Sequence, residues 1–199
     1  MAPLDHALPA TGGAPAPTLP WPRRFLASGL FDLAGQQLVW WTAVALVRLE
    51  APALAALPAV GLVALAAWAR GAVALRLAGL GLAVGFAVDG LLVTSGAIAL
   101  TSPLDAGVTA SWMLGLWAAF GLAFGGSMRW LLRWATPLGA VFGAVAGVLA
   151  YRAGAALGVL QIPDGAAPLL AIGLGWGLGV TVLVLGARRL LGCAPEETR

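Results

Sequence analysis

Residues 77–99 read LAGLGLAVGFAVDGLLVTSGAIA, a run of apolar and small residues whose single charged side chain is Asp89. A helix needs about 20 apolar residues to cross a bilayer, so this stretch is long enough for one crossing. Five other stretches have the same character, which predicts an all-α polytopic membrane protein with six transmembrane helices. The six expected crossings are approximately residues 29–48, 52–69, 77–99, 110–128, 135–155 and 167–187.

The composition leaves little room for anything besides this membrane part. The chain has 199 residues, of which 61% are hydrophobic and 10% are charged, whereas soluble domains carry about 25% charged residues. We therefore expect one transmembrane domain over residues 25–190. A proline-rich, disordered cytoplasmic tail is expected over residues 1–24, and a short cytoplasmic tail over residues 191–199.

Arginine carries the whole topological signal, because the sequence contains no lysine. Arginine-rich short loops stay in the cytosol, so the side that holds most arginines predicts cytoplasmic N- and C-termini. Abundant alanine, glycine and arginine without lysine suggest a GC-rich bacterial genome, and the expected location is the bacterial inner membrane. Arginines at helix ends meet anionic membrane lipids, which argues against a nucleic-acid partner. The arginines expected in the cytosol are Arg23, Arg24, Arg70, Arg76, Arg129, Arg133, Arg188, Arg189 and Arg199, and those expected outside are Arg48 and Arg152.

Asp89 is the one acid expected deep in the membrane, twelve residues or roughly 18 Å beyond Leu77. Placing an ionised acid there costs on the order of 3 kcal/mol. Two interpretations stay open. Asp89 is a proton- or ligand-binding group in an internal cavity, or it only fixes helix packing. In the second case its expected hydrogen-bond partners are Gln36, Gln37, Ser95 and Ser127.

Two further polar groups are candidates for ligand binding. Asp32, Gln36 and Trp40 are spaced four residues apart, so they share one helix face, with Gln37 beside them. That face either lines a polar pocket or holds the bundle together. Tyr151 and Arg152 lie near the expected outer interface, where they either bind a phosphate or carboxylate or simply anchor the helix.

Glycines at four-residue steps predict close helix contacts, because they remove side chains along one stripe of a helix. The expected helix-packing glycines are Gly81, Gly85, Gly139, Gly143, Gly147, Gly154 and Gly158. A second set of residues, Arg-Trp pairs after the fourth segment, is typical of interfacial anchors. These anchors are Arg129, Trp130, Arg133 and Trp134.

The residue inventory disfavours several chemistries. The only histidine is His6, in the expected tail, which argues against a Ser-His protease, a bis-histidine haem site and a histidine-bound metal. A phosphate-binding loop of the Walker type requires lysine, which this chain lacks. We therefore expect no cofactor, no metal and no catalytic residue, and an enzyme is the least favoured class.

An ordered set of short motifs runs through the membrane part of the chain. The motifs are Gln36-Gln37 with Trp40-Trp41, Asp89-Gly90, Trp112-Met113-Leu114 with Leu116-Trp117, Ser127-Met128-Arg129-Trp130-Leu131, and Gly147, Tyr151, Gly154 and Leu157-Gly158. In this order they resemble a bacterial inner-membrane family, the domain of unknown function twenty-eight seventy-eight, over residues 29–187. The chain has Gly125-Gly126-Ser127 where the family has Asn-His-Ser.

The resemblance implies a polytopic membrane protein without an established activity, with relatives encoded near lipid-modifying genes. Two functions remain open. The favoured one is a carrier or binding protein for a small or lipidic molecule, with Asp89 and the polar face of the first helix lining its cavity. The alternative is a non-catalytic partner or scaffold of a membrane lipid-modifying or envelope-stress system. A homo-oligomer or a membrane enzyme partner is compatible with both.

Overall fold

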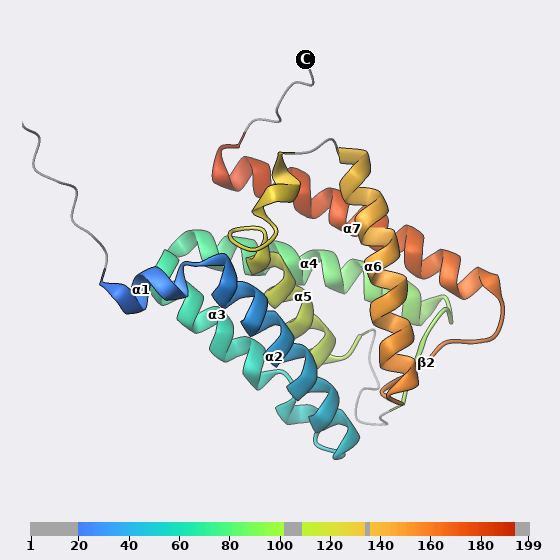
Figure 1. Ribbon diagram of the computed structural model, residues 1–199. Helices are drawn as coiled ribbons and strands as arrows, with labels where there is room; N and C mark the ends of the chain where they lie inside the picture. The colour runs from blue at the N-terminus through green and yellow to red at the C-terminus, as the bar shows by residue number, and fades with distance from the viewer. Residues whose placement is uncertain (1–19, 102–108, 134–135, 194–199) are drawn as a thin grey trace, which may run out of the picture.

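The computed structural model describes residues 20–101, 109–133 and 136–193 and confirms the all-α class. Seven α-helices and two short 3-10 turns, η1 and η3, account for nearly all of its regular structure (Figure 1). These elements are α1 Trp21–Leu26, α2 Gly29–Arg48, η1 Pro52–Leu54, α3 Leu57–Arg70, α4 Ala72–Thr94, α5 Ser111–Ala123, η3 Arg129–Leu132, α6 Thr136–Ala156 and α7 Ala166–Leu191.

Within the described residues, five helical segments are long and apolar enough to cross a membrane. They are Gly29–Arg48, Pro52–Arg70, Ala72–Thr94, Thr136–Ala156 and Ala166–Leu191. The remaining expected crossing, residues 110–128, contains only α5, whose 13 residues give about 20 Å at 1.5 Å per residue. The other helices expose leucine, valine and tryptophan side chains on their outer surfaces, as expected of side chains that face lipid tails.

Four predicted boundaries are wrong, and each error arises near an arginine or a glycine. α4 begins at Ala72, not at residue 77, so Arg76 lies inside its first turns, and α4 ends at Thr94, not at residue 99. The segment expected over 110–128 leaves the helix at Phe124. α7 runs to Leu191 and therefore contains Arg188 and Arg189. An arginine near a helix end can extend its charged head to the interface, so it does not end the helix.

The shifted start of α4 changes the position of Asp89 along the helix. Asp89 lies 17 residues after Ala72, about 25 Å, and five residues before Thr94, about 8 Å. It is therefore closer to the C-terminal end of α4 than the sequence suggests.

The described part of the expected N-terminal tail is helical, so the prediction of disorder over residues 1–24 is wrong at its end. Trp21–Leu26 form α1, with a proline in the first turn, where its missing N–H costs nothing. The Arg23 guanidinium lies 5.1 Å from the Trp68 ring and donates to the Trp68 carbonyl. This contact holds α1 against α3. Residues 1–19 lie outside the described residues.

The helices pack around α5, which is the most buried of them, without closing into a ring. α5 contacts α2, α3 and α4. Helix α4 also contacts α7, and α6 packs against α7 (Figure 1). α2 and α6 are therefore the two ends of this arrangement. Among the described residues they do not form one of the packed helix pairs.

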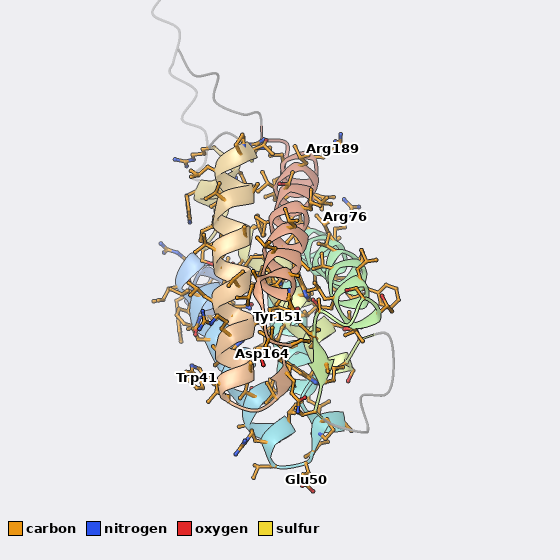
Figure 2. All side chains as sticks on the ribbon, turned by 90° about the vertical axis from the view of Figure 1, so that its right-hand side faces the viewer. Trp41, Glu50, Arg76, Tyr151, Asp164 and Arg189 are labelled. Carbon is orange, nitrogen blue, oxygen red and sulfur yellow. The ribbon has the colours of Figure 1, made fainter. Side chains whose placement is uncertain are left out.

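The two ends of the bundle differ in charge and structure. Figure 2 shows Arg76 and Arg189 toward one end and Glu50 at the other. Near the Glu50 end, β1 (Ala99–Leu100) pairs antiparallel with β2 (Leu160–Gln161), which the sequence did not predict. This short ladder ties the segment after α4 to the α6–α7 connection.

Two glycine seams bring helices into close contact. A Cβ added to Gly81 would overlap the carbonyl oxygen of Trp117 and lie 3.0 Å from Gly121 Cα, and one on Gly85 would overlap the Trp117 ring. These contacts join α4 to α5. Between α6 and α7, Gly143 and Gly147 give the same access to Trp176.

The remaining packing glycines differ in role. Gly139 contacts Val184 on α7. Gly154 packs on Val159 and Leu160, which are not helical. The assignment of Gly158 to helix packing is wrong, because α6 has ended at Ala156 and Gly158 adopts a φ of 74° in the turn that follows.

Candidate functional site

Asp89 joins three helices in the centre of the protein. Its side chain is fully buried. Trp117 Nε1 on α5 donates to Asp89 Oδ2 over 2.9 Å, and the Tyr151 hydroxyl on α6 donates to Asp89 Oδ1. Hydrogen bonds to a carboxylate are stronger than neutral ones. We call this arrangement of Asp89, Trp117 and Tyr151 the three-helix clamp.

The partners expected for Asp89 are wrong. The side chains that donate to Asp89 are those of Trp117 and Tyr151, whereas Ser95 Oγ donates to the Leu92 carbonyl in its own helix. Serine commonly returns to its own backbone in this way. The clamp uses aromatic donors instead, and Trp117 and Tyr151 need an acceptor once they are buried.

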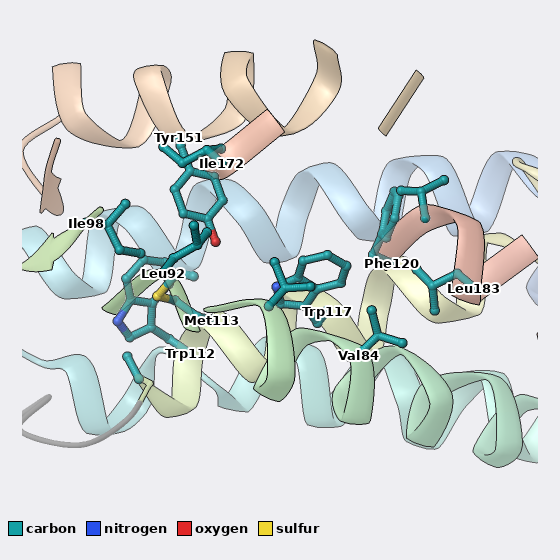
Figure 3. Close-up of a cluster of buried hydrophobic side chains, with 14 of the residues drawn as sticks. Val84, Leu92, Ile98, Trp112, Met113, Trp117, Phe120, Tyr151, Ile172 and Leu183 are labelled. Atoms are coloured by element: carbon teal, nitrogen blue, oxygen red, sulfur yellow. The ribbon is translucent and has the colours of Figure 1, made fainter. Parts of the chain in front are cut away.

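A cavity of about 350 Å³ reaches the clamp from the centre of the bundle. It lies between α2, α5, α6 and α7, and we call it the central cavity. Figure 3 shows Tyr151 extending its hydroxyl inward from α6, with Trp112, Trp117 and Phe120 spaced along the same cluster. Its lining residues are Leu33, Gln36, Gln37, Trp40, Val44, Asp89, Trp112, Met113, Leu116, Trp117, Phe120, Ala123, Ser127, Met128, Ala146, Ala150, Tyr151, Gly154, Val159, Leu160 and Trp176.

The lining includes most of the residues proposed from the sequence. Asp89, Gln36, Gln37, Trp40 and Tyr151 all border this one cavity. They come from α2, α4 and α6, which are distant in sequence. The sixth candidate, Arg152, is the exception.

Arg152 does not line the central cavity, so the structure does not bring Tyr151 and Arg152 together there. Tyr151 is buried, whereas Arg152 is exposed. Successive residues on a helix point about 100° apart, and these two therefore face opposite environments.

Two buried polar atoms in the cavity wall lack partners. Gln36 Oε1 and Trp176 Nε1 are out of contact with solvent and have no well-directed hydrogen-bond partner, although the Trp176 indole lies beside the Tyr151 side chain. A buried polar group without a partner costs about 1–3 kcal/mol. One is an acceptor and the other a donor, so the cavity offers both functions to a molecule inside it.

Asp32 leaves the expected polar face and forms an ion pair. Arg70 NH1 and NH2 donate to Asp32 Oδ2 and Oδ1 over 2.9 and 2.8 Å. Both side chains are nearly buried, at 10% exposure for Arg70 and 1% for Asp32. A Cβ added to Gly126 would overlap the Asp32 carboxylate, so the glycines after α5 leave room for this pair. Arg70 thus joins α3 to α2 and does not reach for head groups.

We expect Arg70→Lys to destabilise the protein by about 1–2 kcal/mol, because lysine cannot form the two parallel bonds that a guanidinium makes. Thermal unfolding in detergent measures the change. Arg76→Lys is the matched control, since Arg76 is exposed, and it should leave the unfolding temperature unchanged. Equal stability of the two variants would contradict a structural role for the Asp32–Arg70 pair.

The expected interfacial anchors lie outside the central cavity. Arg129 and Arg133 are exposed at the two ends of η3. Trp130 is 45% exposed and lies 6.0 Å from Phe142 between ring centroids. Trp134 lies outside the described residues. The buried arginine nearby is Arg188, which donates from Nε to the Leu132 carbonyl over 3.0 Å and thereby binds η3 to α7.

The site also contains aromatic residues that the sequence analysis did not assign to it. Trp117 and Trp176 stack with centroids 4.4 Å apart, and Phe120 lies 5.6 Å from Trp176. Tryptophan usually marks membrane interfaces. A tryptophan well inside an apolar segment, such as Trp117, was the available signal, because its N–H requires a buried acceptor.

Among residues 20–101, 109–133 and 136–193, no group of three histidine, cysteine, aspartate or glutamate side chains could hold a metal ion. The chemistry that this arrangement supplies is binding: an aromatic wall, one unpaired acceptor and one unpaired donor.

Comparisons with known proteins agree with the resemblance drawn from the sequence. The model of a family described as "Protein of unknown function (DUF2878)" matches residues 30–182, which confirms that resemblance. No curated protein and no solved structure matches the chain.

Proposed function

We propose that this chain, which belongs to the DUF2878 family of proteins of unknown function, binds a small or lipidic molecule in its central cavity as a membrane carrier or binding protein. The observation that carries the proposal is the cavity itself. Its volume of about 350 Å³ falls in the range of ligand sites, which are mostly apolar with a few placed polar groups.

The clamp and the cavity have separate roles in this proposal. Both oxygens of Asp89 already accept a hydrogen bond, from Trp117 and Tyr151. Asp89 therefore positions the aromatic wall, and the ligand meets Gln36 and Trp176, whose polar atoms are unpaired. Membrane lipids are the most abundant source of such a ligand.

We further propose six crossings of a bacterial inner membrane with both termini in the cytosol. α5 is too short to cross a bilayer alone, but most of its residues are buried inside the bundle. Irregular backbone is tolerated at membrane depth where protein surrounds it, so the half-buried segment 124–133 completes the crossing. Arg76 and Arg189 lie toward the end opposite Glu50 (Figure 2), which supports this orientation.

Reporter fusions test the topology. Fusions after residues 50, 105 and 164 should report the periplasm, and a fusion after residue 134 should report the cytosol, because arginine-rich loops remain inside. The reverse pattern would overturn the orientation. A periplasmic signal after residue 134 alone would show that residues 110–133 do not cross the membrane.

A cavity-filling variant tests the binding function. Leu116 lines the central cavity from α5, and Leu116→Trp should place an indole in the space of the ligand. We expect the amount of small molecule that co-purifies with the protein, measured by mass spectrometry of an organic extract, to fall about tenfold, which corresponds to about 1.4 kcal/mol of binding.

Leu149→Trp is the matched control, because Leu149 is 64% exposed on the outer side of α6. It makes the same substitution outside the cavity and should retain the wild-type amount. If both variants carry equal amounts, or if the wild-type protein carries none, the binding function is wrong.

The alternative function, a non-catalytic scaffold, has one observation in its favour. An apolar groove of about 620 Å³ runs along α6 and α7, and its exposed lining residues include Val145, Leu149, Leu170 and Leu174. Helices associate in a membrane through van der Waals packing, so such a groove favours contact with another membrane helix. A wild-type protein that carries no ligand but forms a cross-linkable oligomer or a complex with a membrane enzyme would favour this alternative.

A further inference from the structure

Exposed lining residues indicate that the central cavity opens on the side of the bundle. Leu33 on α2 lines the cavity and is still 51% exposed, and Gln37 is exposed as well. On α6, the small side chains Ala146 and Ala150 line the cavity. Because α2 and α6 are not a packed pair among the described residues, the opening that these observations indicate, the mouth of the cavity, lies between the two helices.

This mouth lies at the depth of the hydrocarbon. Gln37 follows the start of α2 by eight residues, about 12 Å, and Ala146 follows the start of α6 by ten, about 15 Å. Both distances fall near the middle of a core about 30 Å thick. The neighbouring outward side chains, such as Leu38 and Leu149, are apolar and more than 60% exposed. A molecule at this mouth therefore meets lipid tails.

We infer that the ligand enters the central cavity sideways from the bilayer, between α2 and α6, and that it is an uncharged, single-chain amphiphile such as a long-chain alcohol. This inference rests on the proposed binding function and specifies its ligand class and entry route. Three features of the cavity support it.

The first feature is the absence of basic groups. No arginine borders the cavity among the described residues, and its ionisable side chains, Asp89 and Tyr151, are bonded to each other. A phosphate or carboxylate head group would lose its hydration without gaining a cation. The ligand must therefore be uncharged in the part that enters.

The second feature is the pair of unpaired polar atoms. Gln36 Oε1 requires a donor and Trp176 Nε1 requires an acceptor. A hydroxyl group can serve either atom, since it donates one hydrogen and accepts through its lone pairs. A pure hydrocarbon would leave both atoms unsatisfied.

The third feature is the length of the lining. It runs along α6 from Ala146 to Gly154 and along α2 from Leu33 to Val44. Eleven residues of α2 cover about 16 Å. An elongated, apolar chain parallel to the helices matches this shape.

Photolabelling in vesicles tests the inference. The probe is hexadecanol with a mid-chain diazirine in phosphatidylcholine vesicles, and the comparison probe is hexadecyl phosphate with the same diazirine. We expect saturable labelling of the α2 and α6 peptides that line the cavity by the alcohol, and about tenfold less by the phosphate, as expected from the cost of an unpaired buried charge.

A reversible cross-link tests the route. Gln37→Cys and Ala146→Cys, in a Cys193→Ser background, place one thiol on each side of the mouth. A reducible bis-maleimide should close the opening, slow labelling by the alcohol about tenfold, as a gated entry step does, and lose that effect on reduction. The same protein, measured before and after reduction of the cross-link, is therefore its own control.

The outcomes separate this inference from the proposed function. An unchanged labelling rate in the cross-linked protein, or failure of the two thiols to cross-link, overturns sideways entry. Equal labelling by the phosphate, or labelling outside the cavity only, overturns the uncharged ligand. If the double variant does not fold, Ala150→Trp against Leu149→Trp repeats the comparison, and equal labelling of these two overturns the inference. The amount of small molecule that co-purifies with the Leu116→Trp protein tests the binding function independently.

Discussion

Gly81→Ala is expected to destabilise the protein by about 3 kcal/mol, the upper part of the usual range for overpacking a close contact. The added Cβ would overlap the carbonyl oxygen of Trp117 and approach Gly121 Cα to 3.0 Å. Both neighbours are backbone atoms, so no side-chain rotation relieves the overlap. α4 and α5 must separate, which also pulls Trp117 away from Asp89. Thermal or denaturant unfolding in detergent measures the loss.

Gly79→Ala is the matched control on the same helix. A Cβ on Gly79 would meet nothing within 4 Å, and alanine favours helix over glycine by up to about 1 kcal/mol. This variant should be as stable as the wild type or slightly more stable. If Gly81→Ala and Gly79→Ala unfold at the same temperature, the close contact between α4 and α5 is wrong.

Asp89→Ala is expected to cost about 3 kcal/mol, because it leaves two buried donors without an acceptor, each at about 1–3 kcal/mol. The donors are Trp117 Nε1 and the Tyr151 hydroxyl. For a protein of this size the unfolding temperature should fall by about 10 °C. An unchanged unfolding temperature would show that the three-helix clamp does not hold the bundle.

Asp89→Asn separates the structural role of this residue from proton exchange. The amide oxygen still accepts one hydrogen bond, and the amide nitrogen can donate to the Tyr151 oxygen. We therefore expect a loss of about 1 kcal/mol and retention of the bound molecule. A stable Asp89→Asn protein that has lost its ligand or its cellular phenotype would instead assign proton exchange to Asp89.

Hydropathy predicted the helices well because a helix surface that faces lipid must carry apolar residues. The segments expected over 29–48 and 135–155 agree with α2 and α6 within one residue at each end. At Ser28 the side chain caps α2 by accepting from Phe31 N over 3.2 Å. Hydropathy could not predict the early end of α5, since a helix surrounded by protein need not be as long as the bilayer is thick.

Sequence spacing predicted parts of the site but not its connections. Gln36 and Trp40 share a face because they belong to one helix, and they line one cavity as that spacing indicates. Asp32, at the same spacing, turns to Arg70, which lies 38 positions away in the chain. Asp89 likewise finds Tyr151, 62 positions away. Such partners depend on how helices pack, and a periodic pattern within one helix contains no information about that.

The most direct test of a ligand-binding central cavity is a density map of the wild-type protein in lipid nanodiscs. We predict elongated non-protein density between α2 and α6, with one end within hydrogen-bonding distance of Gln36 Oε1 and Trp176 Nε1. A map in which α2 closes on α6 and side chains fill the space beside the three-helix clamp would contradict the account.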